Sequence, residues 1–158
     1  KGLSGGIYPI AAAVLSPRVA GWLDEDGWAH VSTFGGAELG CCVALKVLEI
    51  CTRSAVRENV RMVAERLGAG LRDIQSRHAD WLVEIRQQGL VMGLKFAHQQ
   101  GGMLMSKALY EEGIWAMFAG HDLSVLQFKP GMLLDQATCD ETLERFDRGV
   151  RRCRDALR

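Results

Sequence analysis

Three groups of side chains in this sequence could act on a carbonyl compound, a phosphate or a carboxylate. Lys1 precedes a glycine-rich run (residues 2–6), and a lysine amine can form a Schiff base with an aldehyde cofactor or a carbonyl substrate. Ser32 and Thr33 precede two glycines and a helix-like segment, where hydroxyls suit a phosphate. Arg86 lies in a strand-like run, and its guanidinium can bind a carboxylate through two hydrogen bonds.

Each group also has a plain structural interpretation. A lysine before a flexible turn is commonly just solvated. Ser32 or Thr33 could cap the helix that follows. Arg86 could form a salt bridge at a strand edge, which contributes little to stability. Residue types alone leave these alternatives open.

Three blocks of sequence carry a family resemblance. The run KGLSGGIYPI (residues 1–10) resembles the cofactor-lysine segment of the class III aminotransferases, which depend on pyridoxal phosphate. The run HVSTFGG (residues 30–36) is similar to a second segment of that family, and RQQGLVMG (residues 86–93) is similar to a third. The blocks occur in the family's order and span most of the chain. One position departs from the pattern, because Gln87 stands where the family usually has glycine.

The resemblance implies a role for each group. Lys1 would be the catalytic residue that binds the cofactor as an imine, and Ser32 and Thr33 would bind the cofactor. Thr33 would reach the phosphate across a subunit interface, which implies at least a homodimer. Arg86 would hold the substrate carboxylate. The reaction would move an amino group from an amino acid or amine to a 2-oxo acid, and the first block is closest to the ornithine, acetylornithine, putrescine and 4-aminobutyrate aminotransferases.

Two alternatives to transamination stay open. Racemases, aminomutases and decarboxylases of the same fold share the lysine and the cofactor. The chain could also be an inert fragment or an interaction module, because it lacks the segments that grip the cofactor ring. Family members have a long segment before this lysine, so we interpret the chain as a C-terminal portion and expect it not to catalyse transamination alone.

The expected fold is of the α/β class. Residues 1–52 would form the end of the large pyridoxal-phosphate-binding domain of the aspartate-aminotransferase fold (fold type I). Residues 53–80 would form a connecting helix, since apolar residues recur there at intervals of three or four. Residues 81–158 would form a small C-terminal α+β domain, because strand-like and helical segments alternate there.

Local patterns predict the individual elements. Residues 10–15 predict a short buried strand, and residues 37–51 a well-buried helix. Further strands are expected at 82–86, 90–96, 114–118 and 125–128, and a helix at 103–112. The last helix should begin near Thr138, where Thr138 and Glu141 match a capping box.

Composition excludes several classes of function. Lys plus Arg and Asp plus Glu both number 19, so there is no net charge to attract nucleic acid. Five cysteines, an odd number with Cys41 and Cys42 adjacent, indicate a reducing compartment, and we expect a cytoplasmic protein. The four histidines lack metal-ligand spacing, so no metal site is expected. The longest apolar run, residues 10–15, is too short to cross a membrane.

Overall fold

A computed structural model describes residues 2–157, and the chain divides into two compact units between Arg53 and Ser54. Lys1 lies outside the described residues. The segment predicted to connect two domains, 53–80, falls in the second unit except for Arg53, and its helix packs there on a strand and on the last helix.

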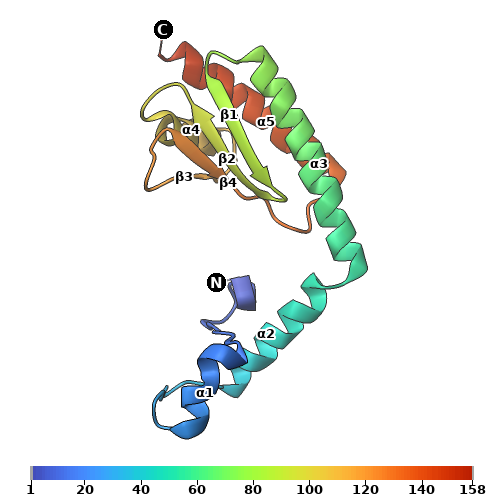
Figure 1. Cartoon of the computed structure of the whole chain (residues 1–158). Helices are drawn as coiled ribbons and strands as arrows, with labels where there is room; N and C mark the ends of the chain where they lie inside the picture. Colours follow the sequence, from blue (N-terminus) through green and yellow to red (C-terminus); the bar gives the residue numbers. More distant parts are fainter. Residues whose placement is uncertain (1, 158) are drawn as a thin grey trace. The chain divides into compact units, whose positions relative to one another are not determined.

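The first unit is a short 3-10 turn, η1 (Gly2–Ser4), followed by helices α1 (Pro17–Glu25) and α2 (Glu38–Cys51) (Figure 1). The strand predicted at 10–15 is wrong: these residues are irregular, and residues 11–15 are exposed. A strand needs backbone partners, and the described part of this unit contains no strand to supply them. The helix predicted at 37–51 is confirmed, but its burial is not, because only Gly40 and Ala44 are buried.

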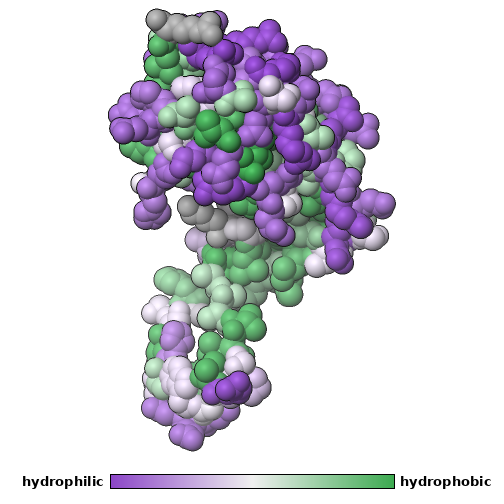
Figure 2. Space-filling view, turned by 45° about the horizontal axis from the view of Figure 1, so that its top comes forward, coloured by the Kyte–Doolittle hydropathy of each residue, from purple (hydrophilic) through white to green (hydrophobic). Residues whose placement is uncertain are grey.

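Large hydrophobic side chains cover much of the surface of the first unit, as Figure 2 shows in green. The most exposed are Val14, Trp28, Phe34 and Ile7, at 95%, 85%, 85% and 76%. Exposed apolar area of this extent is typical of a surface that packs against other protein.

The second unit is built on a four-stranded antiparallel sheet in the order β1-β2-β4-β3 (Figure 1). The strands are β1 (Leu82–Gln88), β2 (Val91–Phe96), β3 (Met117–Phe118) and β4 (Val125–Phe128). Helices α3 (Ser54–Arg77), α4 (Gly101–Glu111) and α5 (Gln136–Asp155) pack against one face. The predicted strands are confirmed, although β3 is shorter than the predicted run 114–118.

The core of this unit lies between the sheet and the helices. Met92, Leu94 and Phe96 alternate along β2 and are at most 2% exposed, so one face of the strand is buried. Phe128 of β4 meets Phe146 of α5 edge to face, with ring centroids 5.7 Å apart. Burial of each large side chain contributes about 1.5–3 kcal/mol. This core fixes which face of the sheet is left to solvent.

Helix α4 begins directly on the backbone of the sheet. A Cβ at Gly102 would lie 2.3 Å from the carbonyl oxygen of Val125, and one at Gly101 would lie 2.4 Å from the Cβ of Phe96. The backbone N–H of Gly102 donates to the carbonyl of Leu123 at 2.9 Å. The two glycines therefore permit a contact that no larger residue allows.

Helix α5 begins earlier than the sequence predicted, and its cap differs. It starts at Gln136, and the cap is Asp135, whose carboxylate accepts a hydrogen bond from the backbone N–H of Thr138 at 2.8 Å. Hydrogen bonds from Thr138 also hold the pKa of Asp135 below its ordinary value. The capping box predicted at Thr138 is wrong because the helix already contains Thr138, whose carbonyl accepts from the hydroxyl of Thr142.

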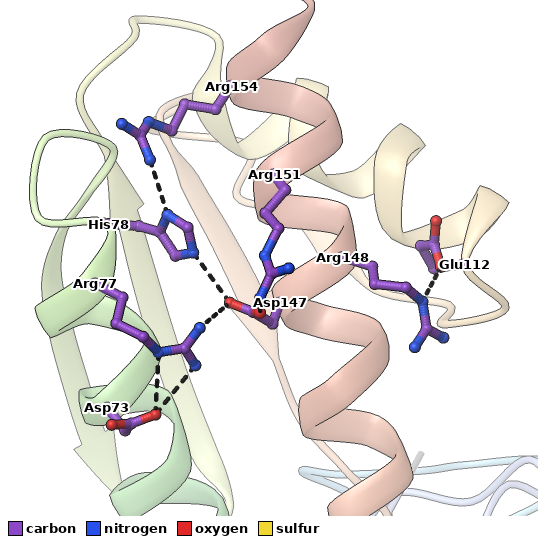
Figure 3. Close-up of polar contacts among 8 residues, drawn as sticks. All are labelled: Asp73, Arg77, His78, Glu112, Asp147, Arg148, Arg151 and Arg154. Atoms are coloured by element: carbon purple, nitrogen blue, oxygen red, sulfur yellow. Dashed lines mark hydrogen bonds and ion pairs between the residues drawn. The ribbon is translucent and has the colours of Figure 1, made fainter.

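A buried charge cluster joins the end of α3 to α5 (Figure 3). Asp147 is 8% exposed and accepts hydrogen bonds from Arg77 (2.8 Å), from His78 Nε2 (3.0 Å) and from Arg151. Arg154 Nη1 lies 3.0 Å from His78 Nδ1. Since arginine only donates, Nδ1 is the acceptor and Nε2 carries the hydrogen donated to Asp147. Burial alone would raise the pKa of Asp147, but the hydrogen bonds from Arg77 and His78 outweigh it and lower that pKa.

We predict that Asp147→Asn lowers the free energy of unfolding at pH 7 by about 1.5–3 kcal/mol, the range for hydrogen bonds to charged groups. Because the folded-state pKa is lowered, this contribution is present above about pH 4 and is lost as the pH falls further. Urea unfolding at pH 7 and near pH 3 measures both effects. Asp155→Asn, an exposed carboxylate on the same helix, is the control. Equal losses in the two variants at pH 7 would contradict the prediction.

Candidate functional site

The segment after Lys1 is held in a tight turn by a buried serine. Ser4 is 0% exposed, and its Oγ donates a hydrogen bond to the carbonyl of Tyr8. Between them, Gly5 and Gly6 have φ angles of +62° and +80°, the left-handed region that glycine adopts without strain. The glycine-rich run is therefore an ordered turn in this chain.

The same turn packs on helix α2. A Cβ at Gly40 of α2 would lie 3.1 Å from the ring of Tyr8, and a Cβ at Gly5 would lie 3.4 Å from a methyl carbon of Val47. The second motif, residues 30–36, leads into the same helix. Helix α2 is thus the element that both motifs of the first unit share.

Ser32 and Thr33 lie in turns ahead of α2, and neither caps it. The backbone N–H of Gly35 donates to the carbonyl of Ser32 at 3.2 Å, which closes the first turn. The N-cap of α2 is Ala37, and no side chain caps the helix. The alternative that Ser32 or Thr33 serves as the cap is therefore wrong.

The two hydroxyls are available to a ligand. Both side chains are exposed, and within residues 2–157 neither hydroxyl has a hydrogen-bond partner. A hydroxyl donates one hydrogen bond, so two adjacent hydroxyls suit the oxygens of an anion. Gly36 has a φ of +70°, which turns the chain back toward the helix. This arrangement fits a phosphate contact.

Arg86 lies on the face of the sheet that the helices leave open. It pairs with Gly93 of β2, and a Cβ at Gly93 would lie 3.8 Å from Arg86 Nε. Arg86 Nε also lies 3.4 Å from Glu84 Oε1, with both side chains more than half exposed. An exposed pair of this kind contributes only about 0.2–1 kcal/mol. The salt bridge expected as an alternative is present, but it is weak enough for an incoming carboxylate to replace Glu84.

An open hollow of about 440 Å³ surrounds Arg86. The residues that line it together with Arg86 include Gln88, Val91, His121 and Asp122. Asp122 accepts hydrogen bonds from the hydroxyl (2.5 Å) and the backbone N–H (3.0 Å) of Ser124, and these hold its pKa below the ordinary value. Lys95 Nζ also lies 3.5 Å from Asp122 Oδ2, so this carboxylate already has a cationic partner. The hollow therefore offers the Arg86 guanidinium as its cation, which suits a carboxylate ligand.

Gln87 points to the opposite side of β1 from Arg86. Its Nε2 donates to the carbonyl of Ala64 on α3 at 2.8 Å and to the carbonyl of Gly89 at 3.1 Å. The strand pairing runs regularly through Arg86, Gln87 and Gln88. The departure from the family pattern at Gln87 therefore leaves the strand at Arg86 intact.

The structure divides the predicted site residues between the two units. Ser32 and Thr33 share a turn in the unit that contains the segment after Lys1, and Arg86 lies in the other unit. Sequence reasoning missed His121 and Asp122 beside Arg86, because a short loop carries no periodic signal. It also missed the pair of His78 and Asp147, which are 69 residues apart in sequence.

No group of three or more His, Cys, Asp or Glu side chains among residues 2–157 is arranged to hold a metal ion. Within the same residues, every helix is too short or too polar to cross a bilayer.

The sequence matches the family model described as aminotransferase class-III over residues 1–150. An uncharacterised aminotransferase of Archaeoglobus fulgidus is 43% identical over 92% of this chain and 34% of its own length. The acetylornithine aminotransferase of Caldanaerobacter subterraneus is 33% identical over 93% of this chain and 35% of its own length. A succinylornithine transaminase of Yersinia enterocolitica is 33% identical over 99% of this chain. The chain thus spans about a third of the length of these relatives.

Solved structures agree on the fold. A transaminase from the marine bacterium Virgibacillus matches 100% of this chain and 39% of its own with a TM-score of 0.88 at 20% identity. The ornithine aminotransferase of Toxoplasma gondii matches 98% of this chain and 36% of its own with a TM-score of 0.84 at 23% identity. At these identities the likeness establishes the α/β fold of fold type I transaminases.

Proposed function

Because the chain belongs to the class-III aminotransferase family, we propose that it supplies the C-terminal third of a pyridoxal-phosphate-dependent aminotransferase. The family match over residues 1–150 carries this proposal, since it spans the Lys1 segment, the Ser32–Thr33 turn and the strand of Arg86. Residues 81–158, which lie in the second unit, would form the small C-terminal α+β domain.

The donor groups of the first unit fit pyridoxal phosphate. The unpartnered hydroxyls of Ser32 and Thr33 suit a phosphate, and the ordered turn at Gly5 and Gly6 holds the chain next to Lys1. When bound, the cofactor supplies an electron sink for negative charge at the substrate carbon. Lys1 would bind the cofactor aldehyde and would take the proton from the carbon that bears the amino group.

Arg86 would orient the substrate by its carboxylate. The guanidinium offers two parallel N–H donors. Replacing its weak ion pair with Glu84 by a bond to the substrate carboxylate costs little free energy. The proposed substrates are an amino acid or amine of the ornithine type and a 2-oxo acid, as the names of the acetylornithine and succinylornithine relatives suggest.

The proposed assembly is a homodimer in which Thr33 binds the phosphate held by the other subunit. The exposed apolar side chains of the first unit support its burial against further protein. The five cysteines are free thiols, which supports a cytoplasmic location.

We predict that Lys1 carries the cofactor in the complete enzyme. Borohydride reduction of the holoenzyme followed by peptide mapping should find the pyridoxyl label on Lys1. The other four lysines, Lys46, Lys95, Lys107 and Lys129, are internal controls in the same digest. A label on any of these instead of Lys1 would refute the assignment.

We predict that Thr33→Ala weakens cofactor affinity by about 1.5–3 kcal/mol, because a hydroxyl bond to a charged phosphate is lost. Cofactor titration followed by absorbance measures the change. Thr52→Ala is the matched control, because the Thr52 hydroxyl bonds only to the carbonyls of Leu48 and Glu49 in its own helix. Equal affinity in Thr33→Ala and the unmodified enzyme would remove Thr33 from the phosphate site.

We predict that Arg86→Gln raises the KM for 2-oxo acids by roughly 10- to 150-fold, which corresponds to about 1.5–3 kcal/mol. The KM for an aldehyde acceptor, which has no carboxylate, should stay within about twofold. Arg61→Gln, an exposed arginine on α3, controls for the loss of a surface charge. A similar rise for both acceptors would show that Arg86 does not bind the carboxylate.

A further inference from the structure

We propose that Gln87 and Gly68 form an interlock that positions Arg86 for carboxylate binding. The proposal rests on the function proposed above and adds a positioning residue to it. Gln87 follows Arg86 on β1, and because side chains alternate along a strand, the two point to opposite faces. Arg86 faces the hollow, and Gln87 faces helix α3.

Gly68 supplies the space that the Gln87 amide occupies. A Cβ at Gly68 would lie 2.3 Å from Gln87 Oε1 and 3.0 Å from both Cδ and Nε2. Gly68 is buried inside α3 and has no positive φ, so the helix geometry does not require glycine there. Glycine inside a helix lowers its stability. A Cβ at this position would force the Gln87 amide to move, so glycine allows the amide to lie where it does.

The amide of Gln87 ties three elements together. Its Nε2 donates to Ala64 of α3 and to Gly89 of the β1–β2 turn, and Arg72 donates to its Oε1 at 3.5 Å. All three elements lie in the second unit. One side chain thus fixes the end of β1 relative to the helix and to the turn.

Strand β1 needs such a contact because it is an edge strand. Among residues 2–157 its only neighbouring strand is β2, so half of its backbone groups make no ladder bonds that would hold its end in place. The interlock acts one residue from Arg86. Loss of the interlock would let the end of β1 shift and would turn the guanidinium away from the carboxylate.

The test uses the complete enzyme and three variants: Gln87→Gly, Gly68→Ala and the double variant. Gly68→Ala leaves Gln87 in the chain but displaces its amide, so both single variants should raise the KM for a 2-oxo acid. We expect the KM for a 2-oxo acid to rise about tenfold in each single variant, which is less than the rise expected for Arg86→Gln. The KM of the double variant should not rise further. The KM for an aldehyde acceptor and the absorbance of the bound cofactor should not change.

Thermal unfolding tests the contact independently of activity. Gly68→Ala should raise Tm by about 2–4 °C in the Gln87→Gly background, where only the gain in helix propensity remains. In the unmodified background, Gly68→Ala should raise Tm by less or should lower it, because the new Cβ also displaces the Gln87 amide. Gly70→Ala is the matched control, because a Cβ there would meet Leu143 and not Gln87. Its effect on Tm should be the same in both backgrounds.

Each outcome decides the proposal. Additive effects on KM, equal effects on the 2-oxo acid and the aldehyde, or identical Tm shifts of Gly68→Ala in both backgrounds would overturn the interlock. If the unmodified enzyme transfers no amino group to any 2-oxo acid, the proposed function fails and the positioning role fails with it. The Tm comparison still decides in that case whether Gln87 and Gly68 are in contact.

Discussion

The second unit depends on the close approach of helix α4 to the backbone of the sheet. At Gly102 a single methyl group would overlap the main chain of Val125, which cannot move without breaking the ladder. The core side chains Met105 and Leu109 lie on the same helix and are fully buried. Because this contact holds the helical layer to one face, the opposite face remains free for Arg86 and its hollow.

Hydrophobic periodicity predicted the long elements well. The spacing of Val60, Val63 and Leu67 predicted helix α3, and the strand-like run 90–96 predicted β2. The strand and the burial predicted at residues 10–15 both failed, because an apolar run specifies neither a strand partner nor a covering layer, and the described first unit has no strand to pair with this run. The cap of α5 failed because the helix begins one turn earlier than the capping-box pattern indicated, and its cap is Asp135.

The residues of the candidate site could be predicted only where a short sequence motif contains them. The hydroxyl pair and the strand position of Arg86 can be identified from short motifs. The surroundings of Arg86 come from distant parts of the chain: its neighbour Gln87 meets Ala64 across 23 residues, and Asp122 of the hollow meets Lys95. The sequence showed Gln87 only as an exception to a family pattern, and Gly68 is one glycine inside a helical pattern. Their shared explanation is steric and appears only when both are in place.

Because β1 is an edge strand, the charged side chains of Glu84 and Arg86 also affect how the sheet meets other molecules. An edge strand exposes unpaired backbone groups that can recruit a strand from another molecule, and charged side chains along such an edge oppose that addition. The charges that suit Arg86 to a carboxylate therefore also protect the sheet from aggregation. A neutral residue at this position would carry a cost in solubility that is separate from any loss of binding.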